Sequence, residues 1–98
     1  MNRLSLWGRV TGIGPVRYTP AGLPALEFKV QHLSEQVEAG GRRRIECVVP
    51  AIALGPIVER IVAAGDEAPA TFSGFIASRR QGAEQMVFHV TELELERN

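Results

Sequence analysis

Residues 26–50, LEFKVQHLSEQVEAGGRRRIECVVP, decide the fold of this chain. In both halves of this stretch the side chains alternate between two sets, a period of two that is typical of β-strands with one buried face. Gly40 and Gly41 predict a turn between the halves. The stretch is therefore predicted to be a long β-hairpin with three consecutive arginines in its joining loop. The side chains expected on the core face are Leu26, Phe28, Val30, His32, Ile45, Cys47 and Val49.

The rest of the chain predicts three more strands and one helix. Residues 3–11, 71–80 and 85–95 alternate as strands, and residues 55–65 carry an apolar helical face between Pro56 and a terminating Gly65. Gly8 and Gly74 interrupt two of the strands, as glycines do at bulges and barrel corners. Five strands, with a short helix between the third and the fourth, predict an all-β fold over residues 1–98, a Greek-key barrel of the OB-fold type.

Composition excludes several classes of protein. A chain of 98 residues with 45% hydrophobic content is long enough to build one core without disulfides or metals. Its single cysteine fits a reducing cytoplasm, and one cysteine with two separated histidines predicts no metal site. No apolar run is long enough to span a membrane. No nucleophile lies near a base in the sequence, so neither an enzyme nor a cofactor is expected.

The charge distribution points to a phosphate backbone as ligand, although the formal net charge is zero. Acidic residues gather around the middle connection and near the C-terminus, whereas basic residues gather in the long hairpin and around residues 79–80. A cationic surface with exposed aromatic rings is typical of proteins that bind single-stranded nucleic acids. The predicted DNA-binding residues are Arg17, Tyr18, Lys29, Arg42, Arg43, Arg44, Arg79 and Arg80.

The aromatic candidates leave alternatives open. Trp7 lies on the strand face opposite the core set, so it is expected either to stack on bases or to lie in a dimer interface. Tyr18 either stacks on bases or packs within its loop. Cys47 is expected to be a small buried residue, and His32 and His89 are expected to have structural roles.

The chain resembles the family of primosomal replication protein N, PriB, over nearly its whole length. The matching segments are Asn2-Arg3-Leu4 with Leu6 and Gly8, residues 20–24, Phe28 with His32 and Ser34, residues 38–40, Cys47, Pro50, residues 74–76 and residues 86–89. The resemblance implies a homodimeric OB-fold that binds single-stranded DNA without sequence preference. It also implies partnership with the helicase PriA and handover to DnaT when replication restarts.

The sequence departs from the family pattern at the DNA-binding surface. Glu46 stands where well-known members carry a stacking aromatic residue, and Leu33 stands where they carry a basic one. A lysine-rich loop of the family is reduced here to Arg79 and Arg80. These differences predict weaker DNA binding on an unchanged fold. The alternative hypothesis is therefore a protein–protein adaptor in which DNA binding is weak or vestigial.

Overall fold

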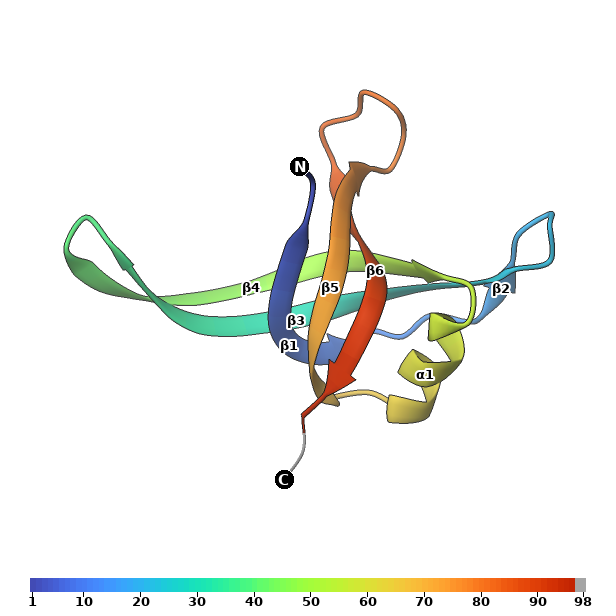
Figure 1. Ribbon diagram of the computed structural model, residues 1–98, viewed down its shortest axis with the longest axis horizontal. Helices are drawn as coiled ribbons and strands as arrows, with labels where there is room; N and C mark the ends of the chain where they lie inside the picture. The colour runs from blue at the N-terminus through green and yellow to red at the C-terminus, as the bar shows by residue number, and fades with distance from the viewer. Residues whose placement is uncertain (97–98) are drawn as a thin grey trace.

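A computed structural model describes residues 1–96 and confirms the OB-fold prediction (Figure 1). The sheet has the strand order β1-β5-β6-β4-β3-β2, and an additional pairing of β1 with β3 closes the barrel. The short β2 is not among the five predicted strands, and it adds a two-residue strand to them. The elements are β1 (Leu4–Thr11), β2 (Arg17–Tyr18), β3 (Pro24–Glu38), β4 (Gly41–Leu54), α1 (Ile57–Ala64), β5 (Pro69–Ser78) and β6 (Met86–Leu95).

The two glycines within strands allow close approaches of the backbone. At Gly8, strand β1 passes from pairing with β5 to pairing with β3, and an added Cβ would lie 2.6 Å from the carbonyl oxygen of Gln31. At Gly74 a register shift marks a bulge, and an added Cβ would lie 1.8 Å from the carbonyl oxygen of His89. Both positions confirm the prediction of a bend or bulge, because no side chain fits where these strands meet.

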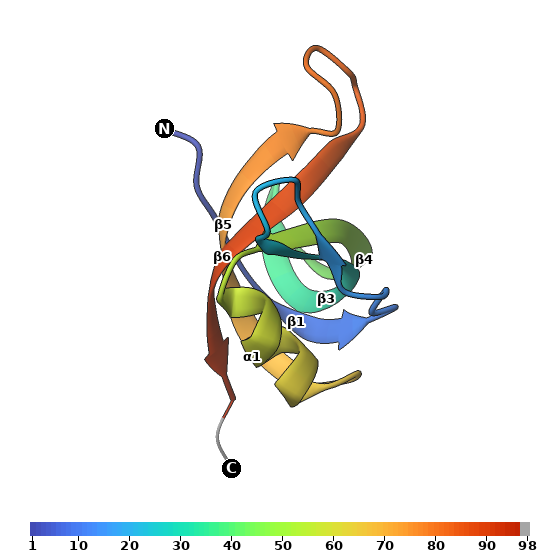
Figure 2. The ribbon, with the colours of Figure 1, turned by 90° about the vertical axis from the view of Figure 1, so that its right-hand side faces the viewer.

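The core is filled by alternate residues of the barrel strands, as the period of two predicts. Leu26, Phe28 and Val30 of β3 are buried, and the rings of Phe28 and Phe72 lie 6.2 Å apart. Helix α1 covers one end of the barrel and buries Val58 and Ile61 (Figure 2). The helix begins just after Pro56 and ends before Gly65, within the predicted range.

The β3–β4 hairpin is longer than predicted, and its turn lies one residue earlier. Ala39 and Gly40 both have positive φ, and Glu38 pairs with Gly41 across the turn. A two-residue loop of this kind matches the right-handed twist of the strands. The prediction that the three arginines lie in the joining loop was therefore wrong, since residues 42–44 belong to β4.

The prediction that Cys47 is buried was also wrong. Its thiol is exposed, and Ile45 on the same face of β4 is only partly covered. The hairpin projects from the barrel beyond Val49 (Figure 1), so the face that continues the core set has no second layer above it within residues 1–96. The alternation of residues 45–49 thus marks a face of the strand, and the barrel covers only part of that face.

Candidate nucleic-acid interface

The candidate interface is the outer face of the β3–β4 hairpin together with the loops beside it. Cross-strand register places Glu35 opposite Arg44 and Val37 opposite Arg42, on the same face as Lys29. Lys29 pairs with Pro50, six residues along β4 from Arg44, so these two cations lie about 20 Å apart along the strands. This spacing gives an elongated surface, which suits an extended strand better than a compact ligand.

One end of this surface gathers cations from three elements. Arg17 of β2 pairs with Ala25, next to Glu27 and Lys29 on β3. The guanidinium of Arg79, at the start of the β5–β6 loop, donates to Glu27 Oε1 at 3.0 Å. The structure therefore brings together Arg17, Lys29 and Arg79, which the sequence separates by up to 62 positions.

The three consecutive arginines do not share one face. Because β4 alternates, Arg42 and Arg44 point to the outer face with Lys29, whereas Arg43 points to the opposite face with Gln36 and Glu38. The interpretation of residues 42–44 as one phosphate-binding cluster is corrected accordingly. Two of the three arginines can reach a strand of DNA that lies on the outer face.

Carboxylates accompany most of these cations. Arg42 pairs with Glu35 at 3.2 Å, and Arg44 lies 3.4 Å from Glu46. Arg43 pairs with Glu38. Exposed pairs of this kind contribute only about 0.2–1 kcal/mol each, so a phosphate can displace the carboxylate at small cost. The sequence analysis had not predicted ion pairs for Glu27, Glu35 or Glu38, because these pairs depend on which residues face each other across strands.

Glu46 lies in the middle of the outer face, directly opposite Leu33. Both side chains are exposed, and they separate Lys29 from Arg44. This central part of the surface therefore offers no ring for stacking and one negative charge. The structure places the two departures from the family pattern side by side.

The two aromatic candidates lie at different places. Tyr18 is 71% exposed and lines an apolar hollow of about 410 Å³ between β2 and α1, so its ring is accessible to a ligand. Trp7 is half-buried on the outside of β1, with the guanidinium carbon of Arg9 5.8 Å from its ring centroid. The position of Trp7 leaves both of its predicted roles open.

The two histidines differ in their contacts. His32 is buried, and its ring nitrogens lie 2.6 Å from the carbonyl oxygen of Trp7 and 2.8 Å from Ser34 Oγ. It therefore ties β3 to β1, as expected of a structural residue. His89 stacks on the partly exposed ring of Phe75 with centroids 4.8 Å apart, and the sequence analysis had not predicted this aromatic pair.

Comparison with known proteins agrees with the fold and assigns a family. The family model described as "Another single-strand binding protein family" matches residues 2–92. The replication restart protein PriB of Nitrosomonas europaea is 39% identical over 94 residues, which cover 96% of this chain and 87% of that protein. The chain belongs to the PriB family.

Other members and a more distant fold relative extend the comparison. PriB of Bordetella pertussis is 39% identical over 92 residues, covering 94% of this chain and 86% of that protein. The structure of PriB from Ralstonia solanacearum superimposes with a TM-score of 0.88 at 26% identity, covering 99% of each chain. A small single-stranded DNA-binding protein from Streptomyces coelicolor shares the fold, with a TM-score of 0.71 at 12% identity over 96% of this chain and 93% of that one.

Within residues 1–96, no three His, Cys, Asp or Glu side chains converge in a way that could hold a metal ion. In the same part of the chain, no helix is long and apolar enough to cross a membrane.

Proposed function

We propose that this protein binds single-stranded DNA without sequence preference and acts as a homodimeric accessory of replication restart in the bacterial cytoplasm, at the nucleoid. The observation that carries the proposal is the outer face of β3–β4, where Arg17, Lys29, Arg42 and Arg44 line one elongated surface. Arg79 and Arg80 in the adjoining loop add two cations. These six cations outnumber the four carboxylates of the same surface and loop, Glu27, Glu35, Glu46 and Glu84, so the surface is positive although the chain is neutral.

A salt titration tests this function. Binding of labelled oligothymidine, measured by fluorescence anisotropy, is expected to weaken with salt with a log–log slope of about −2 to −3.5, as for three to five phosphate contacts. Replacing Arg42 and Arg44 together with alanine is expected to make the slope shallower by about 1.4, because each lost contact removes about 0.7.

Arg43→Ala is the matched control for that titration. It removes one charge, as Arg44→Ala alone would, but on the opposite face of β4, so the slope is expected to stay the same. A slope that responds equally to Arg43 and to Arg44 would show that DNA does not lie on the outer face. Absence of binding even at low salt would rule out the DNA-binding function.

Two features of the chain support a homodimer. Strand β1 pairs with β5 from Leu4 to Arg9, but it pairs with β3 only from Arg9 to Thr11. Within residues 1–96, its second edge from Leu4 to Gly8 therefore has no strand partner, and free edges readily pair with another chain. The uncovered face of β4 that carries Ile45 and Cys47 lies beside this edge, since Cys47 and Trp7 line one groove. A second copy placed there would extend the sheet and cover the exposed thiol.

The oligomeric state gives a second test. Light scattering after size-exclusion chromatography is expected to give about twice the chain mass of 10.7 kDa. Cys47→Glu is expected to weaken the dimer at least about 10-fold, because it buries an unpaired charge in the contact. Val37→Glu introduces the same charge on the outer face of the hairpin, away from this groove, and is expected to leave the dimer intact. A monomeric wild-type protein would contradict this part of the proposal.

The partners proposed within the restart machinery are the helicase PriA and the protein DnaT. Membership of the PriB family supports this placement. A DNA-bound form could pass the strand on, because the ion pairs with Glu35 and Glu46 can re-form as the phosphates leave.

A protein–protein adaptor is the second candidate function. Four arginines of the hairpin and the adjoining loop each pair with a carboxylate: Arg42, Arg43, Arg44 and Arg79. These pairs leave fewer free cations for DNA and so favour the adaptor hypothesis. The discriminating measurement is direct binding to the helicase by a variant with Arg42 and Arg44 changed to glutamate. Retained binding to the helicase, together with no DNA binding by the wild-type protein, would favour the adaptor.

A further inference from the structure

The outer face of the hairpin continues across the barrel as one row of side chains. Glu27 of β3 pairs with Ile52 of β4, and Ile52 pairs with His89 of β6. His89 pairs in turn with Phe75 of β5. Paired residues point to the same face of a sheet, so all four side chains lie on the face that carries Lys29. The row spans four strands, which places Phe75 about 14 Å from Glu27.

Phe75 and His89 form an aromatic pair within this row. Their rings are stacked, with centroids 4.8 Å apart and planes inclined by 10°. Phe75 is 38% exposed, and His89 is partly exposed. Unpaired bases stack on phenylalanine and histidine rings in nucleic-acid complexes. The pair therefore offers a flat aromatic surface on which a base can extend the stack.

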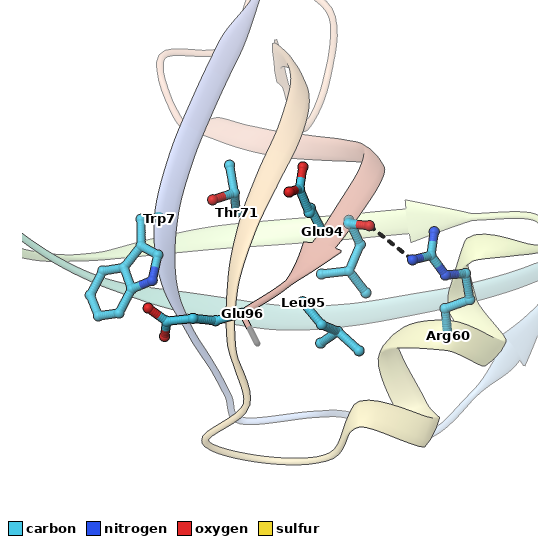
Figure 3. A pocket seen from close by; sticks show the side chains of 7 residues that line it. Trp7, Arg60, Thr71, Glu94, Leu95 and Glu96 are labelled. Carbon is cyan, nitrogen blue, oxygen red and sulfur yellow. Dashed lines mark hydrogen bonds between the residues drawn. The ribbon is translucent and has the colours of Figure 1, made fainter. Parts of the chain in front are cut away.

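The other aromatic rings of the chain are less well placed for this role. Trp7 lies on the outside of β1 (Figure 3), and the guanidinium carbon of Arg9 lies 5.8 Å from its ring centroid, so a base would have to displace a cation. Tyr18 pairs with Pro24, which has the parity of the core residues of β3, so its ring points away from the outer face. Three phenylalanines are buried in the core: Phe28, Phe72 and Phe88.

Cations of the proposed DNA surface lie at the hairpin end of the row. The guanidinium of Arg79 donates to Glu27 Oε1 at 3.0 Å. Lys29 occupies the next outer position of β3 after Glu27. A strand of DNA whose phosphates contact Arg79 and Lys29 can therefore continue along the row and bring a base to the ring of Phe75.

A hollow beside Phe75 leaves room for that base. Its volume is about 230 Å³, and its lining includes Arg3 and Glu92. The side-chain amide of Asn2 holds the N-terminal segment against β5, because it exchanges hydrogen bonds of 2.7 and 3.0 Å with the backbone of Ile76. Arg3 and Glu92 carry opposite charges, so the hollow adds the surface of a ring to the outer face, and no net charge.

We propose that Phe75, backed by His89, is a base-stacking residue of the DNA surface and supplies the aromatic contact that Glu46 does not provide. The inference rests on the proposed function and extends its surface from the hairpin across β4 and β6 to β5. Every base has a flat aromatic face, so stacking on Phe75 agrees with binding that has no sequence preference.

The test compares Phe75→Leu with Phe75→Tyr in the oligothymidine titration. Leucine keeps an apolar contact with His89 but has no aromatic face, so it is expected to weaken binding at least about 5-fold. Tyrosine keeps the ring and is expected to bind within about 2-fold of the wild type. The log–log salt slope is expected to stay the same in both variants, because neither change removes a phosphate contact.

An abasic oligonucleotide of the same length separates stacking from a general change in the surface. It keeps the phosphates and lacks the bases, so wild-type protein is expected to bind it at least about 5-fold more weakly than oligothymidine. Phe75→Leu is expected to bind the abasic ligand as well as the wild type does. Urea denaturation of each variant checks that the fold is retained.

The outcomes distinguish this inference from the proposed function. If wild-type protein and Phe75→Leu bind oligothymidine equally well, Phe75 does not stack on a base, and DNA binding itself stands. Equal weakening by leucine and tyrosine would also overturn the inference, and so would an equal loss on the abasic ligand. Absence of oligothymidine binding by the wild-type protein would overturn the proposed function and this inference together.

Discussion

Replacing Glu46 with tryptophan is expected to tighten binding of single-stranded DNA by about 5- to 100-fold. The indole would lie on the outer face between Lys29 and Arg44, where one base can stack on it, and such stacking contributes about 1–3 kcal/mol per base. The change also removes the carboxylate that holds Arg44 and so frees a cation for phosphate. The measurement is the oligothymidine titration at a fixed salt concentration.

Two further variants separate these causes. Glu46→Gln removes the charge without adding a ring, so it is expected to tighten DNA binding by less than about 5-fold. Glu38→Trp makes the same substitution at a carboxylate that also pairs with an arginine, but on the opposite face of the hairpin. It is expected to leave affinity nearly unchanged. If Glu46→Trp bound no better than wild type, the DNA surface would have to lie elsewhere.

Replacing Gly74 with alanine is expected to lower the free energy of unfolding by about 3 kcal/mol. The new methyl carbon would lie 1.8 Å from the carbonyl oxygen of His89 and 3.1 Å from the amide nitrogen of Thr91. Both are backbone atoms of β6, so relief requires opening the β5–β6 ladder at its bulge. Urea denaturation followed by circular dichroism measures the loss.

Gly41→Ala is the control for this prediction. The nearest atom to its added methyl carbon is the carbonyl oxygen of Glu38 at 3.7 Å, an ordinary contact, and Gly41 has no positive φ. Its free energy of unfolding is expected to change by less than about 0.5 kcal/mol. Similar losses in the two variants would mean that the close approach at Gly74 does not limit stability.

The position at which this chain differs most consequentially from its family was identified from the sequence: the stacking aromatic residue of the family is replaced by Glu46. Glu46 was already a departure from the family pattern. The structure adds that Leu33 lies opposite it and that Arg44 pairs with it, so the middle of the surface lacks both a ring and a free cation.

The sequence by itself determined the barrel and most of its core. Alternation along β3 identified Leu26, Phe28 and Val30 as buried, because a period of two is a local property of a strand. The mid-strand glycines marked the bend of β1 and the bulge of β5, because only a residue without Cβ fits such a close approach. These features depend on near neighbours in the chain, so a sequence pattern can show them.

Only the tertiary structure decided which charges meet and which alternating residues are covered. The turn at Ala39 and Gly40 sets the register. This register places Arg42 diagonally across from Glu35, with which it forms an ion pair, and turns Arg43 to the other face. Cys47 has the alternation of a core residue but is exposed, because burial requires a second layer and the hairpin extends past the barrel. Periodicity identifies the faces of a strand, whereas the packing of distant segments decides what each face meets.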